Sequence, residues 1–295
     1  MRFIAESVSI ILIFLHNSLQ DCRSSAGFTT CSNEYLRRNS PMRINDYKNI
    51  LEFKITSLEE IPTGSFKLLP ELTMLFISNS DVKYLEEGSF DGLYNLRKLS
   101  LYGNKLSMIT NGVFRHCRKL ETLDLGMNKI EEIQADSFNE LTNLKDLNLG
   151  FNNLRTVPSS LNILSLRSLR ILHLNNNQLE TIQPNSFNNL NNLEILNLGD
   201  NKISSLSENA FTGLITLQEL NLGSNDLRSL DPQNLTQNLR RLKTIKLSIN
   251  SFDCDRLRNI IEMFEKKELR WLKAIQNPKI LLMELDVQKL EYLVI

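Results

Sequence analysis

Residues 193–214 read LEILNLGDNKISSLSENAFTGL, and this pattern of apolar residues returns along most of the chain. Copies of it start every 24 or 25 residues, at nine positions: Lys48, Leu72, Leu96, Leu120, Leu144, Leu169, Leu193, Leu217 and Leu242. A fixed short period is typical of proteins in which each unit packs against its neighbours. The sequence therefore predicts one elongated array of nine repeats over residues 48–252, although 295 residues could by length alone form two domains.

Each copy contains a short alternating segment. In the quoted copy, Leu196 and Leu198 flank the polar Asn197, which predicts a short strand with one buried face. One copy cannot cover its own leucines, whereas stacked copies pair their strands into a sheet over a common core. An asparagine follows the strand in most copies, where its amide can bond backbone groups that the turn leaves unpaired. We expect a buried ladder of these residues: Asn104, Asn128, Asn152, Asn177, Asn201, Asn225 and Asn250.

The recurring pattern IPxxxFxxLxxLxxLxLxxNxL, which begins at Ile61 and continues through Phe66 and Leu72, resembles the extracellular 24-residue type of leucine-rich repeat. The resemblance implies an α/β repeat solenoid, a curved horseshoe with a parallel concave β-sheet and a cap at each end. It also implies that the concave sheet binds another macromolecule, and it implies no chemical reaction.

Residues 1–20 are typical of a secretory signal peptide, with Arg2 at the positive start and an apolar run at residues 8–15. The alternative is a short buried helix, which the repeats do not need. No later stretch reaches the roughly 18 uncharged apolar residues of a membrane span. Even the apolar run at residues 280–295 is interrupted by charges. We therefore expect a secreted, extracellular protein.

Four cysteines are consistent with an oxidising compartment. Cys117 stands where other copies carry leucine, so we expect a small buried apolar residue there. The family resemblance implies a cap at residues 21–47 that is closed by a disulfide between Cys22 and Cys31, with residues 32–47 covering the first strand edge. Cys254 is then either a free thiol or one half of an intermolecular disulfide.

Residues 253–295 are predicted to form a helical C-terminal cap and tail. Residues 250–257 resemble the start of the family's C-terminal cap but lack its proline and its second cysteine. Apolar residues at helical spacing over residues 257–275 predict a helix that seals the core or, alternatively, forms a partner site. Within the last repeats, Asn234 begins the sequon Asn234-Leu235-Thr236, a candidate glycosylation site.

Composition and motifs exclude several functions. The 34 Lys and Arg balance the 34 Asp and Glu, so net charge favours neither nucleic acid nor an anionic membrane surface as a partner. Only three histidines are present, without metal-binding spacing, and there is no phosphate-binding glycine loop or nucleophile elbow. Acids on an open sheet also lack the desolvated pocket that acid-base catalysis needs. We therefore expect no metal, no cofactor and no enzymatic activity.

The residues between the buried leucines of each strand face the concave surface. This surface combines polar positions with large apolar residues that the fold does not need to bury, which is typical of interaction sites, although scattered exposed residues are the alternative. Gly126, Gly150, Gly199 and Gly223 are expected to leave small floors beside the apolar residues, unless they only ease the bend after each strand. The predicted ligand-binding residues are Asp124, Met127, Asp146, Asn148, Phe151, Ile171, His173, Ile195 and Asn197.

These observations favour a secreted binding protein that recognises a protein or a microbial surface ligand through its concave face. In architecture the chain is similar to secreted arthropod leucine-rich repeat proteins, such as the leucine-rich immune proteins of mosquitoes, which implies a role in innate immunity. Two alternatives remain. One is an adhesive subunit that forms homo- or heterodimers through Cys254 and the helix predicted at residues 257–275, and the other is the ectodomain of a cell-surface receptor.

Overall fold

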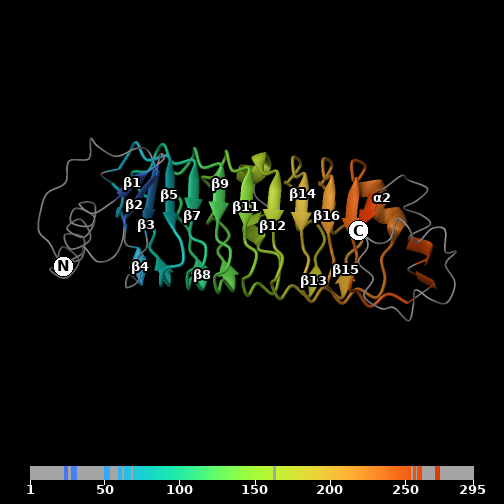
Figure 1. Cartoon of the computed structure of the whole chain (residues 1–295). Helices are drawn as coiled ribbons and strands as arrows, with labels where there is room; N and C mark the ends of the chain where they lie inside the picture. The colour runs from blue at the N-terminus through green and yellow to red at the C-terminus, as the bar shows by residue number, and fades with distance from the viewer. Residues whose placement is uncertain are drawn as a thin grey trace, which may run out of the picture.

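A computed structural model describes residues 23–25, 28–31, 50–53, 59–61, 63–67, 69–161, 164–253, 255–256, 258–260 and 270–272. Its main feature is a 12-stranded sheet with the order β1-β2-β3-β5-β7-β9-β11-β12-β14-β16-β17-β18. Figure 1 shows most of these strands side by side in the order of the sequence, from blue through green to orange. The chain is a repeat solenoid with a parallel concave sheet, and the predicted fold class is confirmed.

Nine strands of this sheet come from the repeat pattern, and each begins two residues after the start of its copy. They are β3 (Ile50–Phe53), β5 (Met74–Ile77), β7 (Lys98–Ser100), β9 (Thr122–Asp124), β11 (Asp146–Asn148), β12 (Ile171–His173), β14 (Ile195–Asn197), β16 (Glu219–Asn221) and β17 (Thr244–Lys246). Neighbouring strands are parallel and in register, so that Leu147 lies opposite both Leu123 and Leu172. Equivalent residues of successive repeats therefore form straight rows across the sheet.

The sheet continues beyond the repeats at both ends. β1 (Arg23–Ser25) and β2 (Phe28–Cys31) form an antiparallel hairpin, and β2 pairs in parallel with β3. At the other end, β18 (Arg270–Leu272) pairs in parallel with β17. The prediction of one helix over residues 257–275 is therefore wrong at residues 270–272, although residues 255–256 and 258–260 are helical. The physical reason is that the edge of β17 offers unpaired backbone groups to residues far along the chain, which side-chain periodicity does not report.

Several predictions lie outside the described residues. These are the signal peptide at residues 1–20, Cys22, residues 32–47, Cys254 and the tail beyond residue 272. The edge of β3, which residues 32–47 were expected to cover, is paired with β2 instead. Cys31 belongs to β2, but a disulfide with Cys22 stays a prediction. No helix in the described part of the chain is long and apolar enough to cross a bilayer.

The core is one continuous cluster beneath the sheet. The inward leucines, such as Leu147, Leu172 and Leu196, are fully buried. Phenylalanines at equivalent positions stack along the array, with ring centroids 5.8 Å apart for Phe66 and Phe90 and for Phe90 and Phe114, 6.1 Å for Phe114 and Phe138, and 6.4 Å for Phe187 and Phe211. Stacking repeats thus extend the core by equal steps, as expected for a solenoid.

Cys117 lies in this core and is 0% exposed, which confirms its prediction as a buried apolar residue. Burial, with a smaller contribution from the charge of Asp91, raises the pKa of its thiol to about 12. The nucleophilic form of cysteine is the thiolate, so Cys117 is chemically inert in the folded protein.

The convex side carries short elements. Two-residue strands pair in parallel: β4 (Glu60–Ile61) with β6 (Tyr84–Leu85), β8 (Met108–Ile109) with β10 (Glu132–Ile133), and β13 (Thr181–Ile182) with β15 (Ser205–Leu206). The fifth repeat instead has two 3-10 helices, η4 (Ser159–Leu161) and η5 (Leu164–Ser168), and the eighth has helix α2 (Pro232–Asn238). Because β11 and β12 keep their register, the extra residue of the fifth repeat is absorbed on the convex side.

The predicted asparagine ladder is confirmed. Asn152 is typical: its Nδ2 donates to the carbonyls of Leu125 and Leu149 at 3.0 and 3.1 Å, and its Oδ1 accepts the N–H of Ile130 at 2.9 Å. Asn104, Asn128, Asn177, Asn201, Asn225 and Asn250 repeat this pattern, and the ladder is buried except at Asn201 and Asn250, which are half-buried. One side chain therefore satisfies three backbone groups and joins two repeats.

Candidate binding surface

The strand register arranges the predicted ligand-binding residues in three rows over four consecutive repeats. The first row contains Asp146, Ile171 and Ile195, and the central row contains Asp124, Asn148, His173 and Asn197. All of these side chains are half-exposed. The third row lies in the turns that follow the strands and contains Met127 and Phe151. The predicted residues thus lie on one face of the sheet.

The central row is bonded to itself. Asn148 Nδ2 donates to Asp124 Oδ1 at 2.8 Å, and Asn221 Nδ2 donates to Asn197 Oδ1 at 2.8 Å. Side-chain oxygens of the central row also accept the N–H of the residue two positions further along the chain. Gly126 donates to Asp124 Oδ1 at 3.0 Å, and Gly150 donates to Asn148 Oδ1 at 2.9 Å. Such local bonds end a strand and begin a turn. Asp124, Asn148 and Asn197 therefore use some of their hydrogen-bonding atoms to form the turns at the ends of their strands.

Two of the four glycines, Gly126 and Gly199, are explained by these amides. A Cβ atom on Gly126 would lie 2.6 Å from Asn148 Nδ2, and one on Gly199 would lie 2.6 Å from Asn221 Nδ2. Glycine is thus needed because the neighbouring side chain crosses directly above it. The expected small floors are filled by these amides, so Gly126 and Gly199 do not form open pockets.

The third row adopts the left-handed backbone conformation throughout. Its members, with φ between 51° and 71°, are Asn79, Gly103, Met127, Phe151, Asn176, Asp200, Ser224 and Ile249. Glycine, asparagine and aspartate tolerate a positive φ, whereas a bulky or β-branched residue rarely adopts it. Met127, Phe151 and Ile249 are the large apolar residues of this row, and they are 53%, 54% and 53% exposed.

Sequence reasoning identified Met127 and Phe151 as exposed but did not detect this conformation. The signal was present, because the equivalent positions of other copies hold Asn79, Gly103 and Asn176. Met127 donates its N–H to the carbonyl of Gly150 at 3.0 Å, so these two apolar residues stand on adjacent, hydrogen-bonded turns. Ile171 and Ile195 lie at the other end of their strands, beyond the polar central row. The apolar residues of this face therefore form two separate pairs, Met127 with Phe151 and Ile171 with Ile195.

Asp146 is the electrostatically unusual residue of the surface. Partial burial raises the pKa of its carboxyl group, Asp124 adds to this, and His173 and Lys98 oppose it. Among the described residues, its carboxylate accepts no hydrogen bond and forms no ion pair. A half-buried carboxylate without a donor is an open acceptor for a partner.

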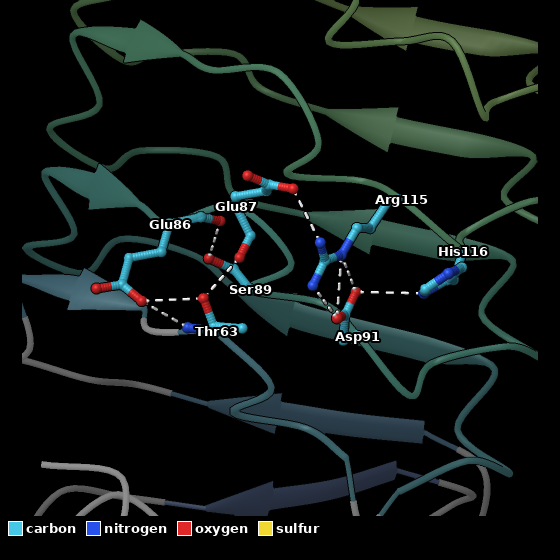
Figure 2. Close-up of polar contacts among 7 residues, drawn as sticks. All are labelled: Thr63, Glu86, Glu87, Ser89, Asp91, Arg115 and His116. Atoms are coloured by element: carbon cyan, nitrogen blue, oxygen red, sulfur yellow. Dashed lines mark hydrogen bonds and ion pairs between the residues drawn. The ribbon is translucent and has the colours of Figure 1, made fainter. Parts of the chain in front are cut away.

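A second polar cluster lies in the segments that follow the short strands β6 and β8 (Figure 2). Arg115 Nε lies 3.0 and 3.1 Å from the two carboxylate oxygens of Asp91, and Arg115 Nη2 lies 2.6 Å from Asp91 Oδ2. Arg115 also reaches Glu87 at 2.8 Å, and His116 Nδ1 lies 3.4 Å from Asp91. Burial alone would raise the pKa of Asp91, but the bonds and charge of Arg115, helped by His116, hold it below its usual range.

This cluster joins repeats and was not predicted from the sequence. Thr63 of the first repeat donates its backbone N–H to Glu86 Oε2 at 2.8 Å, and its single hydroxyl proton is shared between the carbonyl oxygen of Glu87 at 2.6 Å and Glu86 Oε2 at 3.1 Å. A ligand-binding role has no support here, because the charges of Asp91 and Arg115 satisfy one another. We interpret the cluster as an inter-repeat clamp.

The candidate glycosylation site lies in α2. Asp231 caps this helix by accepting the N–H groups of Gln233 and Asn234 at 2.9 and 3.1 Å, and Asn234 Oδ1 accepts from Asn238 at 2.6 Å. Asn234 remains half-exposed. In the described part of the chain, no cluster of three or more His, Cys, Asp or Glu side chains could hold a metal ion.

Comparisons with known proteins agree with this architecture. The family model described as leucine rich repeat matches residues 50–106, 94–154, 118–166 and 167–227, which together cover more than half of the chain. A comparison with curated proteins found no match.

Solved structures with a similar fold include two complexes. The structure of a TLR13–ssRNA13 complex matches with a TM-score of 0.61 and 26% identity over 83% of this chain. The structure of the glycosylated Toll–Spatzle complex, described as a molecular hub in Drosophila development and innate immunity, matches with a TM-score of 0.67 and 25% identity over 77% of this chain. The present chain spans 41% and 32% of those two chains.

Proposed function

Because the chain belongs to the leucine-rich repeat family, we propose that it is a secreted recognition protein that holds a protein or microbial surface ligand on the concave face of its sheet. The proposed binding residues are Asp124, Met127, Asp146, Asn148, Phe151, Ile171, His173, Ile195 and Asn197.

One observation carries this proposal: Met127 and Phe151 are large, apolar, exposed and held in an unfavourable backbone conformation. Non-glycine residues in the left-handed region raise the energy of the fold by about 1–2 kcal/mol each. The fold does not require them, because Asn176 and Asp200 occupy the equivalent positions in the next two repeats. Backbone strain that brings no packing benefit is typical of functional sites.

The geometry suggests how a ligand would be held. Phe151 and Met127 would act as anchors, because aromatic and methionine side chains contribute much of the affinity at protein interfaces. Asp146 would accept a polar group at the opposite end of the strands. The central amides, fixed by their mutual bonds, would present a rigid polar surface between the two, and rigidity lowers the entropic penalty of binding.

The structural similarities support recognition in place of catalysis. The two similar chains were solved in complexes with ssRNA13 and with Spatzle, and the latter complex is described in terms of development and innate immunity. A role in innate immunity, secretion after removal of residues 1–20, the disulfide between Cys22 and Cys31 and a glycan on Asn234 belong to the same proposal. So does the absence of enzymatic activity.

The test removes the anchors without disturbing the fold. The double variant Met127→Asn, Phe151→Asn installs the residue that Asn176 already provides in the sixth repeat. A control variant, Tyr84→Asn together with Ile215→Asn, removes two equally exposed apolar residues, 58% and 59%, outside the concave rows.

Both variants and the native protein would be screened against displayed extracellular proteins and whole bacterial cells. We expect ligands that bind the native and control proteins equally and the anchor variant at least ten-fold more weakly. Equal binding to all three proteins would show that the proposed face is wrong.

A further inference from the structure

The concave face is locally acidic, although the chain as a whole has no net charge. In the fourth to eighth repeats, the positions on this face hold four carboxylates, Asp124, Asp146, Asp200 and Glu219, and neither lysine nor arginine. His173 is the only basic side chain among them. A surface of one sign attracts partners of the opposite sign and excludes those of its own.

Most of the cations next to this face pair with other acids and not with these four carboxylates. Lys145 and Arg97, at the border of the sheet, both pair with Glu121, and Arg170 pairs with Glu194 at 2.5 Å. Lys98, in the third repeat, lies 5.6 Å from the centre of the Phe76 ring, and its charge offsets only part of the effect of burial on Asp146, whose pKa stays raised. The charged residues at the border of the sheet therefore form ion pairs with one another between successive repeats.

The carboxylates also retain acceptor capacity. Asp146 accepts no hydrogen bond from any described residue, and Asp124 uses only one of its two oxygens, Oδ1, for Asn148 and Gly126. Both acids lie on the neighbouring strands β9 and β11, where Asp146 lies opposite Thr122 and Asp124 lies opposite Asn148. Arginine and lysine are the side chains that bind such paired, partly desolvated carboxylates.

We infer that the ligand of the concave face is a protein segment that places an arginine or lysine over Asp146 and Asp124 and an aromatic or aliphatic side chain over Met127 and Phe151. This inference rests on the proposed concave site and adds the chemistry of its partner. Asp146 lies at the start of β11 and Phe151 in the turn after its end, whereas Asp124 is the last residue of β9 and lies nearer to Met127. At about 3.3 Å per residue, an extended partner would need roughly three to five residues between the basic and the apolar side chain.

The same charges oppose polyanions. Proteins that bind single-stranded nucleic acid do so with a positively charged groove and stacking aromatic residues. Phosphates on this face would meet four carboxylates instead of lysine or arginine. Although the chain is similar in fold to TLR13 solved with ssRNA13, its concave chemistry favours a basic peptide segment.

The experiment is a selection of random twelve-residue peptides, displayed on phage, on the immobilised full-length protein. The selected peptides are then synthesised and their affinities measured for the native protein and three variants. The acid variant is Asp124→Asn with Asp146→Asn, which keeps the shape and the Oδ1 acceptor that Asn148 and Asn197 use in their own repeats. The anchor variant is Met127→Asn with Phe151→Asn. The control variant is Glu131→Gln with Glu180→Gln, which removes two exposed carboxylates outside the face.

The expected result is enrichment of peptides in which arginine or lysine stands three to five residues from an aromatic or aliphatic residue. Their affinity should fall at least ten-fold for the acid and the anchor variants, stay unchanged for the control, and weaken with added salt because exposed charges are screened. A single-stranded RNA probe should not bind the native protein.

Three other results would contradict the inference in different ways. Enriched peptides that are acidic or uncharged, and that lose affinity only for the anchor variant, would overturn the inferred partner chemistry and leave the concave site standing. RNA binding that depends on the anchors would do the same. Peptides that bind the anchor variant as well as the native protein would overturn the proposed function itself.

Discussion

The side chain of Asn152 bonds to the carbonyl of Leu125, which belongs to the preceding repeat, at a distance of 3.0 Å. The same amide accepts the N–H of Ile130, also in that repeat, at 2.9 Å. One buried side chain thus satisfies groups that the turn of a neighbouring unit leaves open.

Replacing Asn152 with alanine would leave several buried backbone groups without partners. Each such group destabilises a protein by about 1–3 kcal/mol, so we expect the free energy of unfolding to fall by at least about 3 kcal/mol in urea denaturation. Asn153→Ala is the matched control, because the Asn153 side chain makes no hydrogen bond among the described residues. Equal losses for the two variants would contradict the assigned role of the ladder.

The left-handed row predicts opposite effects on stability and binding. Phe151→Asn relieves the conformational strain at φ 57° and should raise the free energy of unfolding by up to about 1 kcal/mol, while weakening ligand binding. Paired denaturation and affinity measurements would check this. A marked loss of stability would mean that the Phe151 ring serves packing and that its exposure has no functional meaning.

The Arg115–Asp91 contact predicts a pH-dependent stability difference. Removing the guanidinium with Arg115→Gln leaves Asp91, whose side chain is 12% exposed, without its charged partner. Hydrogen bonds between charged groups are stronger than neutral ones, so the variant should be less stable than the native protein at pH 7.

The sign of the pH effect follows from the lowered pKa of Asp91. A carboxylate with a lowered pKa stabilises the folded state above its usual value of 3.8, and this contribution disappears as the pH falls through the folded-state pKa. Thermal unfolding of the native protein and of Arg115→Gln from pH 7 to below pH 3 should show that their difference in stability becomes smaller in the acid range. A stability difference that does not change with pH would show that Arg115 acts through packing alone.

Asp146 predicts the reverse sign. Its pKa is raised above 3.8, chiefly by burial, so its ionised form destabilises the fold at neutral pH. Asp146→Asn should therefore unfold at a higher temperature than the native protein at pH 7. The difference should shrink as the pH falls through the raised pKa, because the native side chain then becomes neutral. A variant less stable than the native protein at pH 7 would contradict this assignment.

The repeat itself was predictable from sequence. A period of 24 or 25 residues fixes which positions are equivalent, and the same leucines must then face one core in every copy. The strands, the buried position of Cys117 and the asparagine ladder follow from that equivalence. The helix predicted at residues 257–275 failed at β18, because pairing with β17 is a contact between distant segments that side-chain periodicity cannot report.

Tertiary structure alone decided how the concave face is built. Sequence placed Asp124, Asn148 and Asn197 in one row, but only the in-register sheet shows that such side chains bond to one another and to the following glycine. The left-handed conformation of Met127 and Phe151 likewise depends on the turn that all repeats share. The pairing of Arg115 with Asp91 depends on convex segments stacked one repeat apart. The physical reason is that local periodicity determines which side chains are buried, whereas hydrogen bonds and charges on the surface are set by distances between separate repeats.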